Sequence, residues 1–176
     1  MEILLSAERI QQRIAEMAGE IAADYRGKSA VTILGVLTGS LMFLADLVRR
    51  FDLPLRIGFI QASSYRGATT TAGQLRVSPD LVPDVRGRHV LLLDDILDTG
   101  RTLHGVVGHV LELAPVSLRV AVLLRKQGRQ SMPIEPNYCG FTIPDAFVVG
   151  YGLDYDDEFR HLPYIAVLPE RSGDYE

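Results

Sequence analysis

The sequence has 176 residues, of which 47% are hydrophobic, and it carries a formal net charge of -4. This length predicts a single domain over residues 1–176, because such a chain can bury most of the surface that its unfolded form exposes. The acidic balance is untypical of nucleic-acid binders, which usually carry a basic domain or stripe. No apolar run approaches the roughly 20 residues of a membrane span, and no signal peptide is recognisable at the start. We therefore expect a cytoplasmic protein with neither a membrane nor a nucleic-acid partner.

Cysteine and histidine give no sign of a metal centre. Cys139 is the only cysteine, which excludes an intrachain disulfide and a multi-cysteine zinc site. Cysteine is often buried, and no histidine near it in the sequence supplies a base, so we expect Cys139 to be a spectator. The histidines lack metal-ligand spacing, and we expect them on the surface or packed against helices.

The first predicted element is a helix from Ser6 to about Tyr25. Ser6 is a suitable N-cap, and Gly27 is suited to stop the helix. Apolar residues recur at helical spacing and fall on one face. These residues are Ile10, Ile14, Met17 and Ile21.

A strand and a second helix follow. Residues 31–37 form an apolar, β-branched run suited to a buried strand, and residues 38–40 form a turn of small residues. We expect a helix next, with an inner face that consists of Leu41, Leu44, Leu47, Val48 and Phe51.

Residues 55–60 are predicted as the next strand, and residues 61–86 follow without a sustained period but with many Ser, Thr, Gly and Pro. A structureless stretch of that length in a compact domain is usually a mobile functional loop or lid. The alternative is an exposed hairpin in which part of the stretch forms strands. The two interpretations are compatible, because a lid can be a flexible hairpin.

The second half of the sequence continues this alternation. Residues 89–93 form an apolar strand that ends in acidic residues, and a helix is expected soon after Gly100. Its inner face would consist of Leu103, Val106, Val107, Val110 and Leu111. Further strands are predicted at residues 116–124, 146–151 and 164–168. Strands that alternate with helices predict an α/β fold with a central, mostly parallel sheet flanked by helices.

Three acidic residues, Asp94, Asp95 and Asp98, lie where the strand at residues 89–93 ends. In an open parallel sheet, ligands bind beyond the carboxyl ends of the strands. Two adjacent carboxylates buried without a partner would cost several kcal/mol each, whereas a hydrated cation or sugar hydroxyls would satisfy them. The alternative is that Asp94 and Asp95 face water, while Asp98 or Thr99 only caps the next helix.

The turn after these acids has the features of a phosphate site. Residues 98–102 read Asp-Thr-Gly-Arg-Thr and offer backbone N–H groups, two hydroxyls and a glycine at the start of a helix. The spacing of a Walker loop is absent. The residues by themselves therefore predict an anion or cation site on a parallel sheet.

Residues 90–102 resemble the phosphoribosyl diphosphate signature of type I phosphoribosyltransferases, which is a hydrophobic strand, two acids and the pattern D-T-G-x-T. The similarity continues at residues 37–40, 64–65, 123–126, 144–155 and 159–160. Together these segments look like the hypoxanthine-guanine branch of that family. The resemblance implies the type I phosphoribosyltransferase fold, with a small hood built from the chain ends. It also implies purine salvage, in which phosphoribosyl diphosphate donates its 5-phosphoribosyl group to hypoxanthine, guanine or both through an oxocarbenium-like transition state.

The same resemblance implies a role for each acid. Asp94 and Asp95 would hold ribose hydroxyls and, partly through waters, Mg²⁺, which is the implied cofactor. Asp98 would accept the proton from the purine ring nitrogen N7. The 5′-phosphate and ribose would be enclosed by the turn that consists of Asp98, Thr99, Gly100, Arg101 and Thr102.

By this resemblance, Thr38 and Gly39 belong to a diphosphate loop in which a non-proline cis peptide bond precedes Thr38. Several family members carry a basic side chain where this chain has Thr38, so one positive charge is missing here. Arg160 would reach the same diphosphate, and Asp154 would bind a second Mg²⁺ on it. Without the resemblance, Asp154 and Arg160 would each be half of an exposed salt bridge, which contributes little to stability.

The resemblance also implies a purine subsite. Lys126 would donate to the exocyclic O6 of hypoxanthine or guanine, which disfavours adenine because adenine presents a donor at that position. Phe147 would stack on the base, the backbone of Val148 would pair with its edge, and Asp154 would belong to the same subsite. Taken alone, Lys126 is more typical of a solvated surface lysine, and Phe147 of core packing.

Two more properties come from the resemblance. Ser64 and Tyr65 would close over the reacting centre as a lid and keep water from the activated sugar. The protein would form a homodimer or homotetramer with an interface that borders the diphosphate loop. The preference among hypoxanthine, guanine and xanthine is not predicted.

Two other functions stay open. The same fold serves as a ligand-sensing, RNA-binding attenuator in pyrimidine regulation, which the low basic content and the match at Lys126 and Phe147 disfavour. A sibling enzyme for adenine, orotate or uracil would share the acidic turn but not the later motifs.

Overall fold

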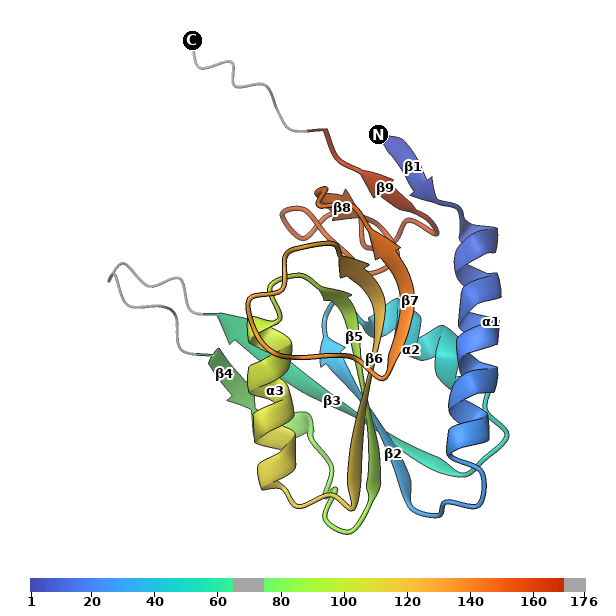
Figure 1. The fold of residues 1–176 in the computed structure, drawn as a ribbon, viewed down its shortest axis with the longest axis vertical. Coiled ribbons are helices and arrows are strands. Elements are labelled where there is room, and N and C mark those ends of the chain that lie inside the picture. Colours follow the sequence, from blue (N-terminus) through green and yellow to red (C-terminus); the bar gives the residue numbers. More distant parts are fainter. Residues whose placement is uncertain (65–74, 170–176) are drawn as a thin grey trace.

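The computed structural model describes residues 1–64 and 75–169 and contains two sheets, with helices around the larger one (Figure 1). The larger sheet has the strand order β4-β3-β2-β5-β6-β7, and the smaller one has the order β1-β9-β8. The strands are β1 (Glu2–Leu5), β2 (Val31–Leu37), β3 (Leu55–Ser64), β4 (Leu75–Ser78), β5 (His89–Leu97), β6 (Ser117–Lys126), β7 (Tyr138–Ile143), β8 (Val148–Val149) and β9 (Ile165–Val167). The helices are α1 (Ala7–Asp24), α2 (Leu41–Val48) and α3 (Arg101–Glu112), with one 3-10 turn, η1 (Pro79–Leu81).

The larger sheet is parallel except at one edge. The five neighbouring strands β3, β2, β5, β6 and β7 run parallel, whereas the edge strand β4 pairs antiparallel with β3. This confirms the predicted α/β fold with a mostly parallel sheet. Strand β2 lies directly beside β5, with Gly35 opposite Leu93. The residues that follow these two strands therefore meet at one edge of the sheet.

Side-chain alternation along the strands divides the core into two layers. Successive residues of a strand point to opposite faces, so Leu91 and Leu93 pack with α1 and α2 while Leu92 packs with α3. All three leucines are almost fully buried. Figure 1 shows α1 and α2 on one side of the sheet and α3 on the other. A strand buried on both faces has to be apolar throughout, as the start of β5 is.

Helix α1 follows the prediction closely. The Oγ of Ser6 accepts a hydrogen bond from the Arg9 backbone N–H at 3.3 Å, which satisfies one of the free donors of the first turn. The helix ends with Tyr25 as its C-cap. Its predicted inner face is buried and consists of Ile10, Ile14, Met17 and Ile21, together with Ala18.

Two helical faces differ in detail from the prediction. Leu41 and Leu111 do not face inward, because they are 38% and 55% exposed. Leu41 is the first residue of α2, and Phe43 is buried on that helix instead. Leu111 follows Val110, the last buried residue of α3, and one step along a helix rotates a side chain by about 100°. Phe51 packs against the core from the segment after α2.

Part of residues 61–86 is regular structure. Strand β3 continues to Ser64 and pairs with β4, so the hairpin interpretation is confirmed for these residues. The sequence did not predict β4, β1 or β7, which are short and lie at the edges of their sheets. The predicted strand at residues 146–151 shrinks to Val148–Val149, because Gly150, Tyr151 and Gly152 take positive φ angles of 98°, 52° and 101°.

The smaller sheet brings together the two ends of the described chain. Strand β9 pairs antiparallel with β1 on one side and with β8 on the other. This confirms the predicted hood. Figure 1 shows the hood beside the edge of the larger sheet at which β5 and β6 end. Residues of the hood can therefore contribute to a site at that edge.

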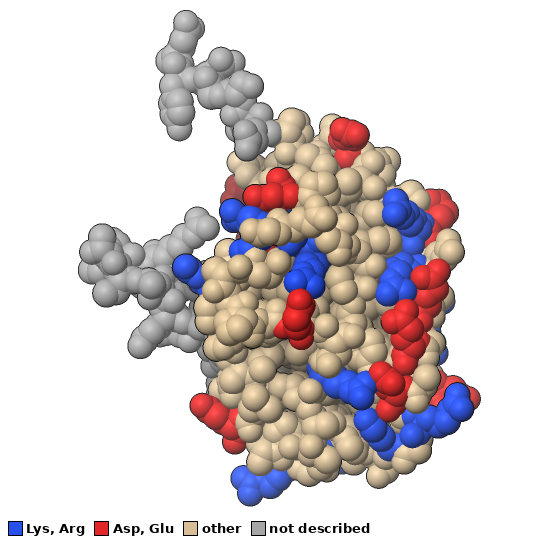
Figure 2. Space-filling model, viewed as in Figure 1, with Lys and Arg blue, Asp and Glu red and all other residues tan. Residues whose placement is uncertain are grey.

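Charges of both signs alternate along the side of the molecule that α1 forms (Figure 2). On this helix, Arg13 pairs with Glu16 and Glu20 at 3.2 and 2.8 Å. On the face that Figure 2 shows, basic side chains lie beside acidic ones rather than in a continuous stripe. Within residues 1–64 and 75–169, no helix is both long and apolar enough to cross a membrane.

The two leucines of α3 provide a test of its buried face. Leu103 is 2% exposed and Leu111 is 55% exposed. Leu103→Ala is expected to lower the free energy of unfolding by about 2–5 kcal/mol, because it removes packed methyl groups and leaves a cavity. Leu111→Ala is expected to change it by less than about 0.5 kcal/mol. Urea unfolding of both variants checks this, and equal losses would contradict the orientation of α3.

Candidate active site

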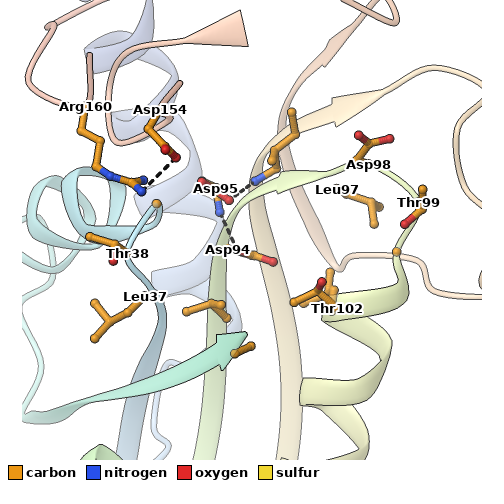
Figure 3. A pocket seen from close by; sticks show the side chains of 16 residues that line it. Leu37, Thr38, Asp94, Asp95, Leu97, Asp98, Thr99, Thr102, Asp154 and Arg160 are labelled. Atoms are coloured by element: carbon orange, nitrogen blue, oxygen red, sulfur yellow. Dashed lines mark hydrogen bonds and ion pairs between the residues drawn. The ribbon is translucent and has the colours of Figure 1, made fainter. Parts of the chain in front are cut away.

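A cavity of about 330 Å³ opens where β2 and β5 end (Figure 3). Ten of the residues singled out from the sequence line it: Thr38, Gly39, Asp94, Asp95, Asp98, Thr99, Gly100, Thr102, Asp154 and Arg160. In Figure 3, Asp94 and Asp95 lie between two groups, with Asp154 and Arg160 on one side and Asp98 and Thr99 on the other. The fold thus assembles residues that are up to 122 positions apart in the sequence, from Thr38 to Arg160.

Asp94 and Asp95 belong to β5 itself, which continues to Leu97 rather than ending before them. Asp94 is 6% exposed, so the alternative that it faces water is wrong. Its Oδ1 accepts the Asp95 backbone N–H at 3.0 Å, and Oδ1 of Asp95 accepts the Ile96 backbone N–H at 2.7 Å. These bonds orient both carboxylates but supply no positive charge.

Burial raises the pKa of Asp94 well above its ordinary value, and the adjacent Asp95 raises it further. Burial also raises the pKa of Asp95, although backbone donors and the positive charge of Arg160 oppose that shift. Two carboxylates that repel each other in a buried place favour a divalent cation or hydroxyl donors.

The donor set suits magnesium. Mg²⁺ prefers oxygen ligands, usually takes only one or two carboxylates from the protein, and keeps waters or substrate phosphates as its remaining ligands. Asp94 and Asp95 offer such a pair on the cavity wall. Within the described ranges, no cluster of three or more His, Cys, Asp or Glu side chains could form a complete cage. The residues therefore fit an ion that is shared with a substrate.

The turn between β5 and α3 leaves backbone donors open at the cavity. Gly100 precedes α3 with φ 82° and provides no side-chain cap, and Oγ1 of Thr99 accepts the Arg101 N–H at a long 3.4 Å. The simple capping alternative is therefore weak, since Asp98 does not cap the helix. A helix N-terminus with free N–H groups is a favourable site for a phosphate. Arg101 is exposed on α3 and does not line the cavity.

Two glycines allow the loop after β2 to pack tightly. The peptide bond between Leu37 and Thr38 is cis, as the family resemblance implied. A Cβ on Gly39 would overlap the carboxylate of Asp95, and one on Gly152 would overlap the carbonyl oxygen of Gly39. Backbone of the hood therefore contacts backbone of the loop, and the loop backbone contacts the carboxylate of Asp95. No larger residue fits at either glycine without movement.

Asp154 and Arg160 come from the connection between β8 and β9. Arg160 donates to Oδ1 of Asp154 at 2.9 Å and to Oδ1 of Asp157 at 3.1 Å. It also donates to the carbonyl oxygen of Gly152 at 2.8 Å, which fixes its guanidinium beside the cavity (Figure 3). The salt-bridge alternative is correct in that Asp154 and Arg160 pair with each other, but their side chains are only 31% and 25% exposed and both line the cavity.

Of the residues implied for a purine subsite, Asp154 lines the cavity, whereas Lys126, Phe147 and Val148 lie outside its lining. Lys126 is only 9% exposed, so it is not a solvated surface lysine. Phe147 is 49% exposed and meets the ring of Tyr155 edge to face at 5.7 Å, so it is not a core residue. Val148 is buried in β8. Both alternatives taken from the residues alone are therefore wrong.

Sequence reasoning missed two residues that contact the site. Arg129 donates to Oδ1 of Asp98 at 3.0 Å, and Asp145 lies 3.6 Å from both Arg129 and Lys126. Nothing in their local spacing indicated this. Of the two residues implied for a lid, Tyr65 lies outside the described residues, as does the side chain of Ser64.

Comparison with known proteins identifies the class. A family model described as "Phosphoribosyl transferase domain" matches residues 1–156. The chain therefore belongs to the phosphoribosyltransferase family, and the fold and the family that the sequence predicted are confirmed.

Its relatives within that family carry a more specific name. Hypoxanthine-guanine phosphoribosyltransferases from Streptococcus pneumoniae and Mycobacterium tuberculosis are 40% and 43% identical to it, over 96% of this chain and 93% and 86% of theirs. The solved structure of a hypoxanthine phosphoribosyltransferase from Trypanosoma cruzi superposes with a TM-score of 0.89 at 41% identity, over 97% of this chain and 96% of that one.

Gly39 provides a test of the tight packing at the cavity. Gly39→Ala is expected to lower kcat/KM for phosphoribosyl transfer at least about tenfold, because the new methyl group displaces Asp95 or the loop. The matched control is Gly19→Ala within α1, where a Cβ meets nothing within 4 Å and should stabilise the helix slightly. Initial rates of both variants check this, and an unchanged rate in Gly39→Ala would contradict the packing.

Proposed function

We propose that this protein is a purine salvage enzyme, which transfers the 5-phosphoribosyl group of phosphoribosyl diphosphate to hypoxanthine, guanine or both and releases diphosphate. The observation that carries the proposal is one cavity that combines the adjacent carboxylates of the buried Asp94 and the half-buried Asp95 with an open helix N-terminus. The names of the relatives support the choice of base. The whole chain, residues 1–176, would act as one catalytic domain. The RNA-binding alternative gains no support from the interspersed charges in Figure 2.

The sugar and its 5′-phosphate would occupy the cavity between β5 and α3. The phosphate would accept hydrogen bonds from the backbone N–H groups and hydroxyls of the turn that contains Thr99, Gly100, Arg101 and Thr102. Arg101 would contribute only its backbone, since its side chain lies away from the cavity. Asp94 and Asp95 would accept hydrogen bonds from the ribose hydroxyls, which relieves the burial of their charges.

The diphosphate would lie toward the hood, between the Thr38–Gly39 backbone and Arg160. Asp94 and Asp95 would hold one Mg²⁺, and Asp154 would help to hold a second. When bound, magnesium neutralises the charge that develops on the leaving diphosphate. Thr38 offers only a backbone N–H and a hydroxyl, so Arg160 is the basic side chain on this side of the cavity lining.

Asp98 would be the proton acceptor for N7 of the purine while the bond to the anomeric carbon forms. Asp98 lines the cavity and lies next to Lys126, whose Nζ donates to Oδ2 of Asp98 at 3.3 Å. Stabilisation of an oxocarbenium-like transition state needs fixed negative charge near the ribose, which Asp94 and Asp95 supply. Closure of Ser64 and Tyr65 over the site would exclude water.

Lys126, Phe147, Val148 and Asp154 would form the purine subsite. Lys126 has three donors, so it can contact O6 of the base while it keeps Asp98 as a partner. The exposed ring of Phe147 is available for stacking, and the ring of Tyr155 lies perpendicular to it with 5.7 Å between the ring centres. A 6-oxopurine satisfies Lys126, whereas the 6-amino group of adenine would face it with a second donor.

The protein would act as a cytoplasmic homodimer or homotetramer whose interface borders the diphosphate loop. Leu41 directly follows that loop and is 38% exposed, as an apolar residue at a subunit contact would be in the isolated chain.

The direct test is formation of nucleoside 5′-monophosphate from phosphoribosyl diphosphate and each base. Hypoxanthine, guanine or both are expected to yield product, and adenine is expected to react at least about 100-fold more slowly, because of the donor mismatch at Lys126. Excess EDTA is expected to abolish product formation, and added Mg²⁺ to restore it. Undetectable turnover with hypoxanthine, guanine and xanthine alike would exclude the proposed function.

A variant of Asp98 separates proton transfer from binding. Asp98→Asn keeps the shape of the side chain but cannot accept a proton, so kcat is expected to fall by about 100-fold or more. Binding of phosphoribosyl diphosphate, measured by calorimetry in the presence of Mg²⁺, is expected to stay nearly unchanged. An unchanged kcat would remove Asp98 as the base.

A further inference from the structure

The connection between β6 and β7 packs against the turn that contains Asp98 and forms hydrogen bonds with its main chain. The backbone N–H of Ser131 donates to the carbonyl oxygen of Thr99 at 3.0 Å. The side-chain amide of Gln130 donates to the carbonyl oxygens of Asp98 and Lys126 at 3.2 and 2.6 Å. These bonds tie the main chain of the turn to the end of β6, so the position of Asp98 depends on this connection.

Charged side chains from the same region engage both oxygens of Asp98. Arg129 donates from Nε to Oδ1 at 3.0 Å, and Lys126 donates from Nζ to Oδ2 at 3.3 Å. Asp145 lies 3.6 Å from each of these two cationic nitrogens. Two acids and two bases thus alternate in a network whose formal charges cancel.

The two cations are not equivalent. The side chain of Lys126 is 11% exposed and that of Arg129 is 44% exposed. In the proposed function, Lys126 also contacts the base, whereas the partners of Arg129 among the described residues are the two acids of the network. Nε of a guanidinium is a fixed donor on a planar group, so it orients a carboxylate more strictly than an ammonium does.

We infer that Arg129 is a positioning residue, which holds Oδ1 of Asp98 so that this carboxylate is oriented and charged when the purine arrives, and that Asp145 holds Arg129 in place. The inference rests on the proposed function, because it gives Asp98 the role of proton acceptor. Arg129 itself need not touch either substrate.

The network has a definite effect on the ionisation of Asp98. Burial raises its pKa, but the hydrogen bond from Arg129 and the charge of Lys126 outweigh burial, so the pKa lies below its ordinary value. Removal of Arg129 takes away one stabilising cation and should raise the pKa of Asp98. Removal of the Asp145 charge leaves both cations to Asp98 and should not raise it. Loss of Arg129 is therefore expected to raise the pKa of Asp98, whereas loss of the Asp145 charge is expected to leave it unchanged or to lower it.

The test compares pH profiles of kcat/KM for the base in three variants. In Arg129→Met, the acid limb of the profile is expected to move to higher pH. At acidic pH, kcat/KM is expected to be about five- to tenfold lower than in the wild type, and the difference is expected to disappear as the pH rises. In Asp145→Asn, the acid limb is expected to stay or to move to lower pH. The matched control is Arg125→Met, which removes an arginine of 31% exposure that pairs with Glu135 and does not contact Asp98.

Two results in Arg129→Met would overturn the inference: a pH profile like that of the wild type, or a decrease in kcat/KM that is the same at every pH. A shift of the acid limb to higher pH in Asp145→Asn would also overturn it. Carbon NMR of the Asp98 carboxyl gives a second readout that does not need activity, and its titration midpoint is expected to rise in Arg129→Met. If the wild-type protein formed no nucleotide, the proposed function would fail, while the NMR midpoint would still decide whether Arg129 controls Asp98.

Discussion

The burial of two adjacent carboxylates at the end of β5 is the constraint on which the site depends. Strand β5 lies between β2 and β6 in the sheet, and Asp94 continues its pairing opposite Val122. Asp94 is buried and Asp95 is half-buried, burial raises the pKa of both carboxyls, and the charge of Asp95 raises that of Asp94 further. A carboxylate pair in such a place is stable as a charged pair only when a cation or hydroxyl donors complete it. The cavity beside it is where such partners can enter.

The hood contributes to the same site through a direct backbone contact with the loop after β2. Gly152 packs against the carbonyl of Gly39, and Gly39 packs against Asp95, so three separate segments touch where no Cβ would fit. Arg160 then donates back to Gly152. This close packing brings Arg160, which lines the cavity, to the side on which a leaving diphosphate would need it.

The two halves of the site differ in their state before a substrate binds. Asp94, Asp95 and the α3 N-terminus border an open cavity, whereas Lys126 forms ion pairs with Asp98 and Asp145, which also pair with Arg129. Entry of a base would therefore exchange polar contacts rather than fill an apolar void.

The sequence by itself determined the elements that local pattern controls. Helical spacing located α1 and its cap, apolar runs located β2, β5 and β6, and the Asp-Thr-Gly-Arg-Thr pattern located the turn before α3, because each depends on neighbours along the chain. Only the tertiary structure decided that Asp94 is buried, that Phe147 is exposed, and that Arg129 and Asp145 reach Asp98. Those properties depend on which strands and connections become neighbours across the sheet, and no local spacing records that.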